Sequence, residues 1–219
     1  MDSEQKQFIV TGMPRSGTSL VIGMCRILGV NLGEEEDIDT RINEEFHPTA
    51  TLQDLAISDF NDLLLKRDGD AGGMFDPPNR IEIAPITKID LQKLILGKIG
   101  TKKLWGVKDP RIILLLPLYA EIMPKPYFIF VMRKWDNLAK ALIRYYPEVN
   151  LEKMYTLYRG YLANIKKIEK KYPTYFIFFK RIIKDSIQEA HLLADFIDVP
   201  LNEEKKKLIK DFVIRKNHA

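Results

Sequence analysis

The first twenty residues hold the feature that most constrains the fold, an apolar run that ends in a loop of small residues. Residues 8–11 (Phe-Ile-Val-Thr) predict a buried strand, and a helical pattern of apolar residues begins at Leu20. The loop between them, residues 12–19, reads Gly-Met-Pro-Arg-Ser-Gly-Thr-Ser. A strand, a glycine-containing loop and a helix in this order bring backbone N–H groups and the positive end of a helix dipole together. The segment therefore predicts a binding site for an anion such as phosphate.

The glycine spacing of this loop also invites comparison with nucleotide triphosphatases. Gly12 and Gly17 match the glycines of the P-loop, but Thr18 stands where that motif has its lysine. The P-loop lysine contacts the terminal phosphates of ATP, whereas this loop offers Arg15, hydroxyl groups and backbone amides. A nucleotide or small-molecule kinase therefore stays an alternative, and the missing lysine counts against it.

Apolar runs and helical patterns alternate along the rest of the chain. Residues 104–108, 127–132 and 175–179 are predicted strands, and they are short continuous apolar runs. Helices are expected at residues 52–64, 89–99, 151–171 and 202–213, after Pro110, from about Asp136 and from a capping box that begins at Ser186. The sequence predicts an α/β protein with a P-loop-like, three-layer fold, in which helices flank a central parallel sheet. The length of 219 residues favours a single domain spanning residues 1–219.

Three basic residues lie at the ends of predicted strands. Arg15 and Arg133 lie just beyond such a strand, and Lys108 is the last residue of one. In parallel α/β sheets, ligands bind outside the carboxyl ends of the strands. Three cations at that edge suit a nucleotide that carries several phosphates.

Composition narrows the class of protein only slightly. The chain has 34 basic and 30 acidic residues, a net charge of +4 that is compatible with a polyanionic nucleotide. Cys25 is the single cysteine, so it forms no internal disulfide, and we expect it to be buried in a helix. No signal peptide precedes the first strand and no apolar run is long enough to span a membrane, so we expect a cytoplasmic protein without a membrane partner. Histidine and cysteine lack ligand spacing, so we expect no metal.

Residues 14–19, Pro-Arg-Ser-Gly-Thr-Ser, carry a family resemblance. They resemble the first loop of the sulfotransferases that use 3′-phosphoadenylyl sulfate (PAPS), whose product nucleotide is adenosine 3′,5′-bisphosphate (PAP). The resemblance implies that this loop binds the 5′-phosphosulfate of PAPS through Arg15, Ser16, Gly17, Thr18 and Ser19.

A second segment, Lys108-Asp109-Pro110, extends this resemblance. It implies that Lys108 contacts the transferring group and the leaving oxygen. Cytosolic sulfotransferases have Lys-Thr-His at this place, and the histidine is their catalytic base. Because Pro110 occupies the histidine position, the segment looks like the tyrosylprotein and bacterial branches, which use a glutamate as base.

The identity of the base stays open at the level of sequence. The tyrosylprotein branch has its glutamate in a Gly-Glu-Glu segment after the first helix, and the similar segment here makes Glu35 the first candidate. Glu36, Glu45 and His47 are alternatives. Bacterial relatives carry an aromatic-Glu pair at a place comparable to Gln53, and glutamine cannot act as a base.

A third segment resembles the site for the 3′-phosphate of the nucleotide. In the family, a strand ends in an arginine, and a serine follows eight residues later. Arg133 fits the arginine, but Ala141 stands at the serine position. The missing hydroxyl removes one hydrogen-bond donor, and Lys134, Lys140 and Arg144 are the nearby residues that could compensate.

Taken together, the motifs predict a sulfotransferase that transfers a sulfuryl group from PAPS to a hydroxyl or amine. We expect a small-molecule or glycan-type acceptor and no nucleic acid partner. The polar segments 33–51 and 67–85 are predicted to form the acceptor site or a lid. Besides the kinase, a non-catalytic nucleotide-binding protein is an alternative, because Ala141 and Gln53 depart from the family pattern.

Overall fold

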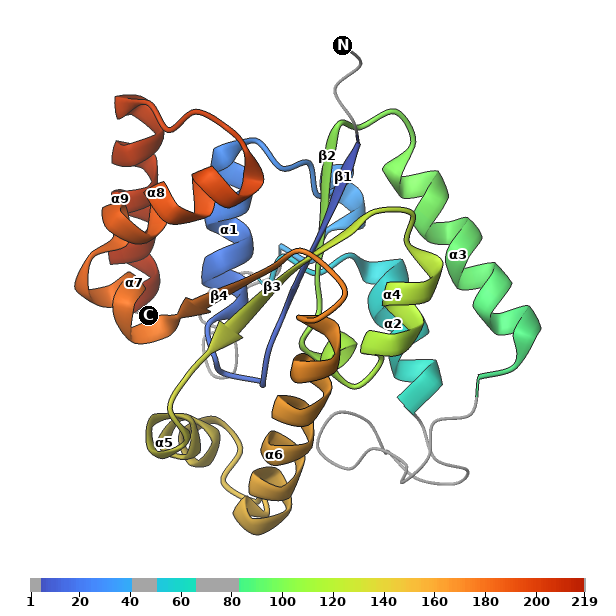
Figure 1. The fold of residues 1–219 in the computed structure, drawn as a ribbon. Coiled ribbons are helices and arrows are strands. Elements are labelled where there is room, and N and C mark those ends of the chain that lie inside the picture. The colour runs from blue at the N-terminus through green and yellow to red at the C-terminus, as the bar shows by residue number, and fades with distance from the viewer. Residues whose placement is uncertain (1–4, 41–50, 66–82, 219) are drawn as a thin grey trace.

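The protein is described by a computed structural model that covers residues 5–40, 51–65 and 83–218. Within these ranges a parallel sheet of four strands, in the order β2-β1-β3-β4, forms the centre (Figure 1). The strands are β1 (Lys6–Thr11), β2 (Leu104–Lys108), β3 (Pro126–Met132) and β4 (Thr174–Phe178). Val10 of β1 lies opposite Lys108 of β2 and Ile129 of β3, so the carboxyl ends of the strands share one edge. The predicted parallel α/β sheet is confirmed.

Helices cover both faces of the sheet (Figure 1). One face carries α1 (Thr18–Leu28), α7 (Phe179–Lys184), α8 (Ser186–Ile197) and α9 (Glu203–His218), and the other carries α2 (Leu55–Leu65), α3 (Pro85–Ile99), α4 (Leu116–Ile122) and α6 (Leu151–Ile168). Successive side chains of a strand point to opposite faces, so Phe8 and Val10 enter the first core and Ile9 enters the second. The three-layer arrangement is therefore the one that the continuous apolar strands predict.

Several predicted boundaries are wrong for local reasons. The segment that begins at Pro110 is a short 3-10 helix, η2 (Pro110–Ile113), and Asp109 is its N-cap. The α-helix α4 starts only at Leu116. The expected capping box at Ser186 is displaced by one residue, since the Asp185 carboxylate accepts the N–H of Gln188 at 2.9 Å and is the N-cap of α8.

Two further differences concern the ends of elements. Helix α3 begins at Pro85 rather than at residue 89, which follows the preference of proline for the first helical turn. Strand β4 ends at Phe178, and the unpredicted helix α7 follows at once. The structure thereby places Phe179 beside the loop that follows β1, as the site geometry below shows.

The structure also bears on two features that were considered from composition, Cys25 and membrane-spanning segments. Cys25 is fully buried in α1, as predicted, and burial raises the pKa of its thiol to about 12. In the described ranges, none of the helices combines the length and the apolar character needed to cross a membrane.

The strand order determines where a ligand can bind. From β1 the chain adds β2 on one side and then crosses back to add β3 on the other side. Such a reversal opens a crevice at the carboxyl ends of the two strands that flank it, here β1 and β3. Helix α5 (Trp135–Tyr145) lies at this edge of the sheet, together with the first turns of α6 (Figure 1).

Candidate functional site

The loop after β1 is a tight turn that requires both of its glycines. The Ser16 N–H donates to the Met13 carbonyl at 3.0 Å and closes the turn. A Cβ on Gly12 would lie 2.5 Å from the Val131 carbonyl oxygen, so only glycine lets the loop pass this close to β3. Gly17 has a φ of 105°, a left-handed conformation that strains other residues. Strand, turn and helix are thus arranged as the sequence predicts.

The start of α1 offers hydrogen-bond donors toward this loop. Its N-cap is Gly17, which has no side chain to cap the first N–H groups of the helix. Arg15, two residues before Gly17, also has a positive φ, of 65°. Left-handed residues within a turn can point successive N–H groups into a concave nest that binds anions. The Ser16 Oγ is buried and has no hydrogen-bond partner in the part of the chain that the structure describes. These groups fit the oxygens of a phosphate or sulfate ester.

The other two hydroxyl residues of the loop sit in the first turn of α1. Thr18 is buried, and Ser19 is half-buried. The Ser19 Oγ donates to the Thr51 carbonyl at 3.1 Å. Ser19 therefore ties the segment that begins at residue 51 to the start of α1.

Arg133 lies against the same loop, as the sequence predicts. Its Nη1 donates to the Arg15 carbonyl at 2.7 Å, while its Nε is buried and has no hydrogen-bond partner among the described residues. The guanidinium carbon of Arg133 lies 4.6 Å from the centre of the Phe179 ring. The guanidinium carbon of Arg15 lies 3.4 Å from the centre of the Tyr145 ring, a cation–π contact.

Burial and mutual repulsion act on both arginines. Burial lowers the pKa of Arg133, and the positive charge of Arg15 lowers it further. Burial also lowers the pKa of Arg15, and Arg144 contributes in the same direction. Guanidinium groups stay protonated at neutral pH, so the structure holds positive charges close together in a partly buried place. Such a cluster favours the binding of an anion.

Lys108 lies at the end of β2 and is 2% exposed. Its Nζ donates to the Gln53 Oε1 at 3.2 Å, and the Gln53 Nε2 donates to the Ser58 Oγ at 2.7 Å. Sequence reasoning treated Gln53 only as a place where a base is missing. The structure instead makes Gln53 a hydrogen-bond partner of Lys108, and its alignment with the bacterial glutamate is the signal that could have found it.

A buried network lies next to Lys108. Asp109 is 1% exposed and accepts hydrogen bonds from the Asn61 Nδ2 at 3.0 Å and the Arg111 Nε at 2.9 Å. The Tyr119 hydroxyl donates to the Asn61 Oδ1 at 2.7 Å. Burial by itself lowers the pKa of Arg111, but Asp109 and Asp62 more than offset this and the pKa lies above its usual value. The sequence predicted the helix cap made by Asp109 but not this network.

The structure does not bring Glu35 to the loop. Its carboxylate is exposed and pairs with Arg26 in the last turn of α1. Arg26 follows Thr18 by eight residues, so it lies about 12 Å along the helix from the end that faces the loop. Glu36 belongs to the same exposed 3-10 helix, η1 (Glu35–Asp37).

The other sequence candidates for the base are Glu45 and His47. Glu45 and His47 lie outside the described residues, as does most of the segments 33–51 and 67–85 that were expected to form the acceptor site. Sequence reasoning missed Asp39, whose carboxylate accepts a hydrogen bond from the Thr51 Oγ1 at 2.9 Å. Because the Thr51 carbonyl accepts from Ser19, Asp39 is linked to the first turn of α1 through one residue.

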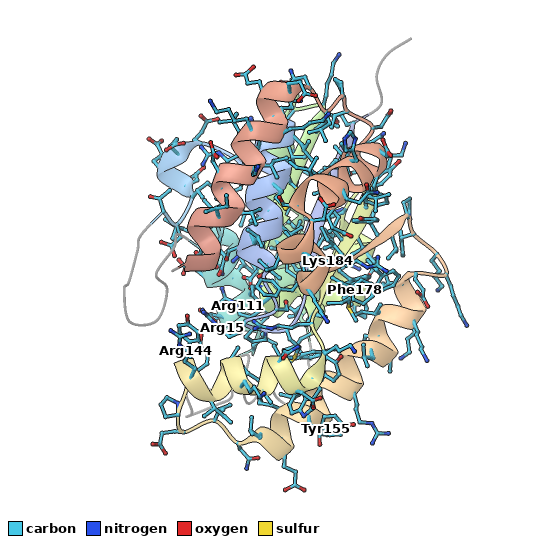
Figure 2. All side chains as sticks on the ribbon, turned by 90° about the vertical axis from the view of Figure 1, so that its left-hand side faces the viewer. Arg15, Arg111, Arg144, Tyr155, Phe178 and Lys184 are labelled. Atoms are coloured by element: carbon cyan, nitrogen blue, oxygen red, sulfur yellow. The ribbon has the colours of Figure 1, made fainter. Side chains whose placement is uncertain are left out.

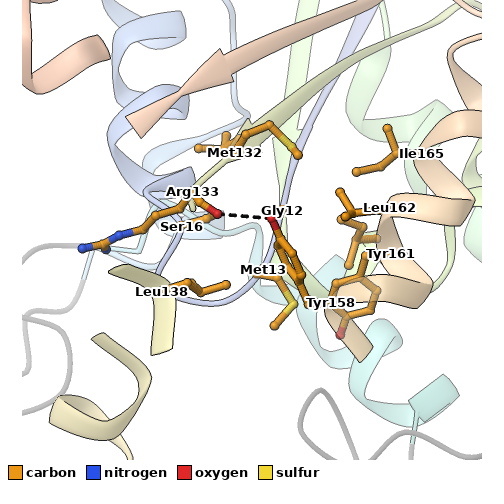
Figure 3. A pocket seen from close by; sticks show the side chains of 12 residues that line it. Gly12, Met13, Ser16, Met132, Arg133, Leu138, Tyr158, Tyr161, Leu162 and Ile165 are labelled. Carbon is orange, nitrogen blue, oxygen red and sulfur yellow. Dashed lines mark hydrogen bonds between the residues drawn. The ribbon is translucent and has the colours of Figure 1, made fainter. Parts of the chain in front are cut away.

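A small pocket, partly open to solvent, lies beside the loop (Figure 3). Its wall is mostly apolar and includes Met132, Leu162 and Ile165. Tyr158 also belongs to this wall, and its hydroxyl donates a hydrogen bond to the Arg133 carbonyl at 3.5 Å. The loop after β1 therefore borders an apolar hollow. Among the described residues, no group of three or more His, Cys, Asp or Glu side chains is arranged to hold a metal.

Comparisons with known proteins agree with this fold. The chain is similar in fold to the sulfotransferase STF9 from Mycobacterium avium (15% identity, 98% of this chain and 69% of that one, TM-score 0.60) and to STF1 from Mycobacterium tuberculosis (12%, 94% and 71%, TM-score 0.54). It is also similar to mouse sulfotransferase SULT7A1, whose structure is a complex with PAP (11%, 97% and 65%, TM-score 0.52). A comparison with curated protein sequences finds no match. A family model described as "Sulfotransferase family" matches residues 7–203, and the chain therefore belongs to the sulfotransferase family.

Proposed function

We propose that the protein transfers a sulfuryl group from PAPS to a hydroxyl or amine of a small-molecule or glycan-type acceptor. The observation that carries the proposal is the unpartnered, buried Ser16 hydroxyl at the open end of α1, with Arg133 packed against the same loop. Family membership supports the chemistry, and the PAP complex of mouse SULT7A1 supports the nucleotide. The residues assigned to the 5′-phosphosulfate are Arg15, Ser16, Gly17, Thr18 and Ser19, and Arg133 is assigned to the 3′-phosphate.

The nucleotide supplies the sulfuryl group and a phosphate that can leave. During transfer, the bond between sulfur and the phosphate oxygen breaks, its electron pair stays on that oxygen, and a bond forms from sulfur to the acceptor oxygen or nitrogen. Lys108, fixed by Gln53, donates a hydrogen bond to the oxygen that gains charge. The N–H groups of the loop hold the phosphate so that little reorganisation is needed during the reaction.

The acceptor must lose a proton as the new bond forms, and a carboxylate or imidazole is suited to take it. In the described part of the chain, Asp39 is the carboxylate that is linked to the start of α1 through Thr51, and the proposal gives it this role. His47 stays a prediction outside the described residues. Glu35 is not included, because its partner is Arg26 at the far end of α1.

Thermal unfolding in the presence of nucleotides tests the proposal. A ligand at 100 times its dissociation constant adds about 2.7 kcal/mol to the free energy of unfolding. We expect PAP to stabilise the protein selectively over AMP and over ATP with magnesium. PAPS should then be converted to PAP in the presence of a panel of hydroxyl and amine acceptors.

Two results would contradict this proposal. Stabilisation by ATP with magnesium but not by PAP would favour the kinase. Selective binding of PAP without turnover of any acceptor, with the Lys108→Ala variant behaving like the wild type, would favour a non-catalytic nucleotide-binding protein.

A further inference from the structure

The absence of a hydroxyl at Ala141 leaves the second phosphate of the proposed nucleotide with one donor fewer than the family pattern. Ala141 is half-buried in α5, and three basic residues lie near it in the sequence. Lys134 and Lys140 are exposed and have no contact with the aromatic residues that support Arg15 and Arg133 in the described part of the chain. Arg144 differs from them, because its guanidinium carbon lies 5.5 Å from the centre of the Tyr145 ring.

The Tyr145 ring connects Arg144 to the loop. The same ring supports Arg15, whose guanidinium carbon is 3.4 Å from its centre. Figure 2 shows the side chains of Arg15 and Arg144 next to each other beside α5. The charge of Arg144 lowers the pKa of Arg15, and the charge of Arg15 lowers the pKa of Arg133. Arg15 therefore interacts electrostatically with Arg144 and also with Arg133.

Helix geometry places Arg144 next to Ala141 on the surface of α5. Residues three apart on a helix are neighbours on its surface, about 5–6 Å apart at Cβ. A long helical side chain covers the turn on the amino-terminal side of its own Cα, which for Arg144 is the turn containing Ala141. Arg144 is exposed and has no ion pair within the described residues, so its donors remain available to a ligand.

We propose that Arg144 takes over the task of the missing hydroxyl and, together with Arg133, selects nucleotides that carry a 3′-phosphate. This inference rests on the proposed function, since it assigns a specificity residue to the same nucleotide site. An arginine presents a fork of charged donors that matches phosphate oxygens, which a serine hydroxyl cannot do.

Binding of PAP and of AMP, measured by titration calorimetry on the full chain, tests this assignment. The Arg144→Ala variant should lose about ten- to hundredfold in affinity for PAP and keep its affinity for AMP, because only PAP carries the 3′-phosphate. Lys140→Ala, which removes the same charge from the same helix, is the matched control and should lose less than about threefold. Adding Ala141→Ser to Arg144→Ala should restore part of the preference for PAP.

The outcomes separate this proposal from the one on which it depends. If wild-type protein binds PAP no better than AMP, the proposed function fails, and the role of Arg144 fails with it. If the wild type prefers PAP and Arg144→Ala keeps the same preference, only the role of Arg144 is wrong. Equal losses in Arg144→Ala and Lys140→Ala would also overturn it, because they would indicate a general effect of positive charge.

Discussion

The ends of β1 and β2 are neighbours at the carboxyl edge of the sheet. They differ in whether their buried polar groups have hydrogen-bond partners. After β1, the Ser16 Oγ and the Nε of the adjacent Arg133 are buried without hydrogen-bond partners in the described chain. After β2, Asp109 accepts hydrogen bonds from Asn61 and Arg111. The pKa of Arg133 is lowered by burial and by Arg15, whereas that of Arg111 is raised by its carboxylate partners despite burial.

This difference suits the end of β1 to binding a ligand and the end of β2 to holding side chains in place. A group of like charges with unpartnered donors gains stability when an anion binds, which is why we propose the end of β1 as the nucleotide site. A satisfied network gains nothing from a ligand, and it holds a neighbouring side chain rigidly instead. Within the end of β2, the Gln53 amide links Lys108 to this network, since it contacts Lys108 and, through Ser58, Asp109.

The largest expected effect is on stability at the end of β2. Asp109→Ala leaves the Arg111 guanidinium buried without its main partner, and we expect the free energy of unfolding to fall by about 3–5 kcal/mol. Urea denaturation of the two proteins measures this directly. Asp62→Ala is the matched control, because Asp62 pairs with the same arginine but its side chain is 51% exposed, and it should cost less than about 1 kcal/mol. Equal losses in the two variants would contradict the distinction between the buried and exposed partners.

The second effect is on binding at the end of β1. Arg133→Met should reduce the affinity for PAP by about 1.5–3 kcal/mol, because it removes charged hydrogen bonds to a phosphate. The free energy of unfolding without ligand should change by less than about 1 kcal/mol, since relief of burial and repulsion offsets the lost bond to the Arg15 carbonyl. Calorimetric titration and urea denaturation give the two quantities. A large loss of stability without ligand would place Arg133 with the supporting residues instead.

The two regions also differ in how well the sequence predicts them. The loop after β1 is local: its glycines, its strand and its helix are contiguous, so periodicity and turn chemistry predict its geometry. Arg133 could be placed because parallel strands end at one edge. The partners of Asp109 come instead from α2 and α4, and no local pattern tells which polar side chains of distant helices will meet in the interior.

The candidates for the base and for the 3′-phosphate site also depend on contacts that the sequence does not reveal. Glu35 was inferred from its distance along the sequence, but the chain turns so that this residue reaches Arg26. The roles proposed for Gln53 and Arg144 rest on contacts with Lys108 and Tyr145, which depend on tertiary packing. Family spacing alone therefore does not tell which side chains of the folded chain come together at the site.

A third effect should appear in turnover. Gln53→Met keeps the size of the side chain but removes the acceptor for the Lys108 Nζ, so Lys108 is less firmly held. We expect kcat to fall by roughly tenfold, about 1.4 kcal/mol, with little change in the KM for PAPS. Steady-state kinetics of PAP formation separates the two constants. A rise in KM with an unchanged kcat would mean that Gln53 serves nucleotide binding and not the positioning of Lys108.

The dependence of PAP binding on pH tests the end of β1 again, with a smaller effect. The pKa of Arg133 is lowered, but a guanidinium still keeps its proton throughout the range from pH 5 to pH 9. A phosphate monoester loses its second proton near pH 6, so the affinity for PAP should rise by roughly three- to tenfold between pH 5 and pH 7 and then stay level. Titrations across this range measure the change. A further rise or fall between pH 7 and pH 9 would show that another group of the protein, not the phosphate, controls binding.

The smallest expected effect concerns Glu35, which the sequence favoured as the base. Its carboxylate is exposed and paired with Arg26, and exposed ion pairs contribute less than about 1 kcal/mol. Glu35→Gln should therefore leave the free energy of unfolding and the turnover of PAPS nearly unchanged, within about twofold for kcat. Asp39→Asn, measured in the same assay, should lower kcat by roughly a hundredfold or more, because it removes the proposed proton acceptor. If Glu35→Gln lowers kcat and Asp39→Asn does not, the segment after α1 must rearrange when substrates bind, and the base predicted from sequence spacing is the correct one.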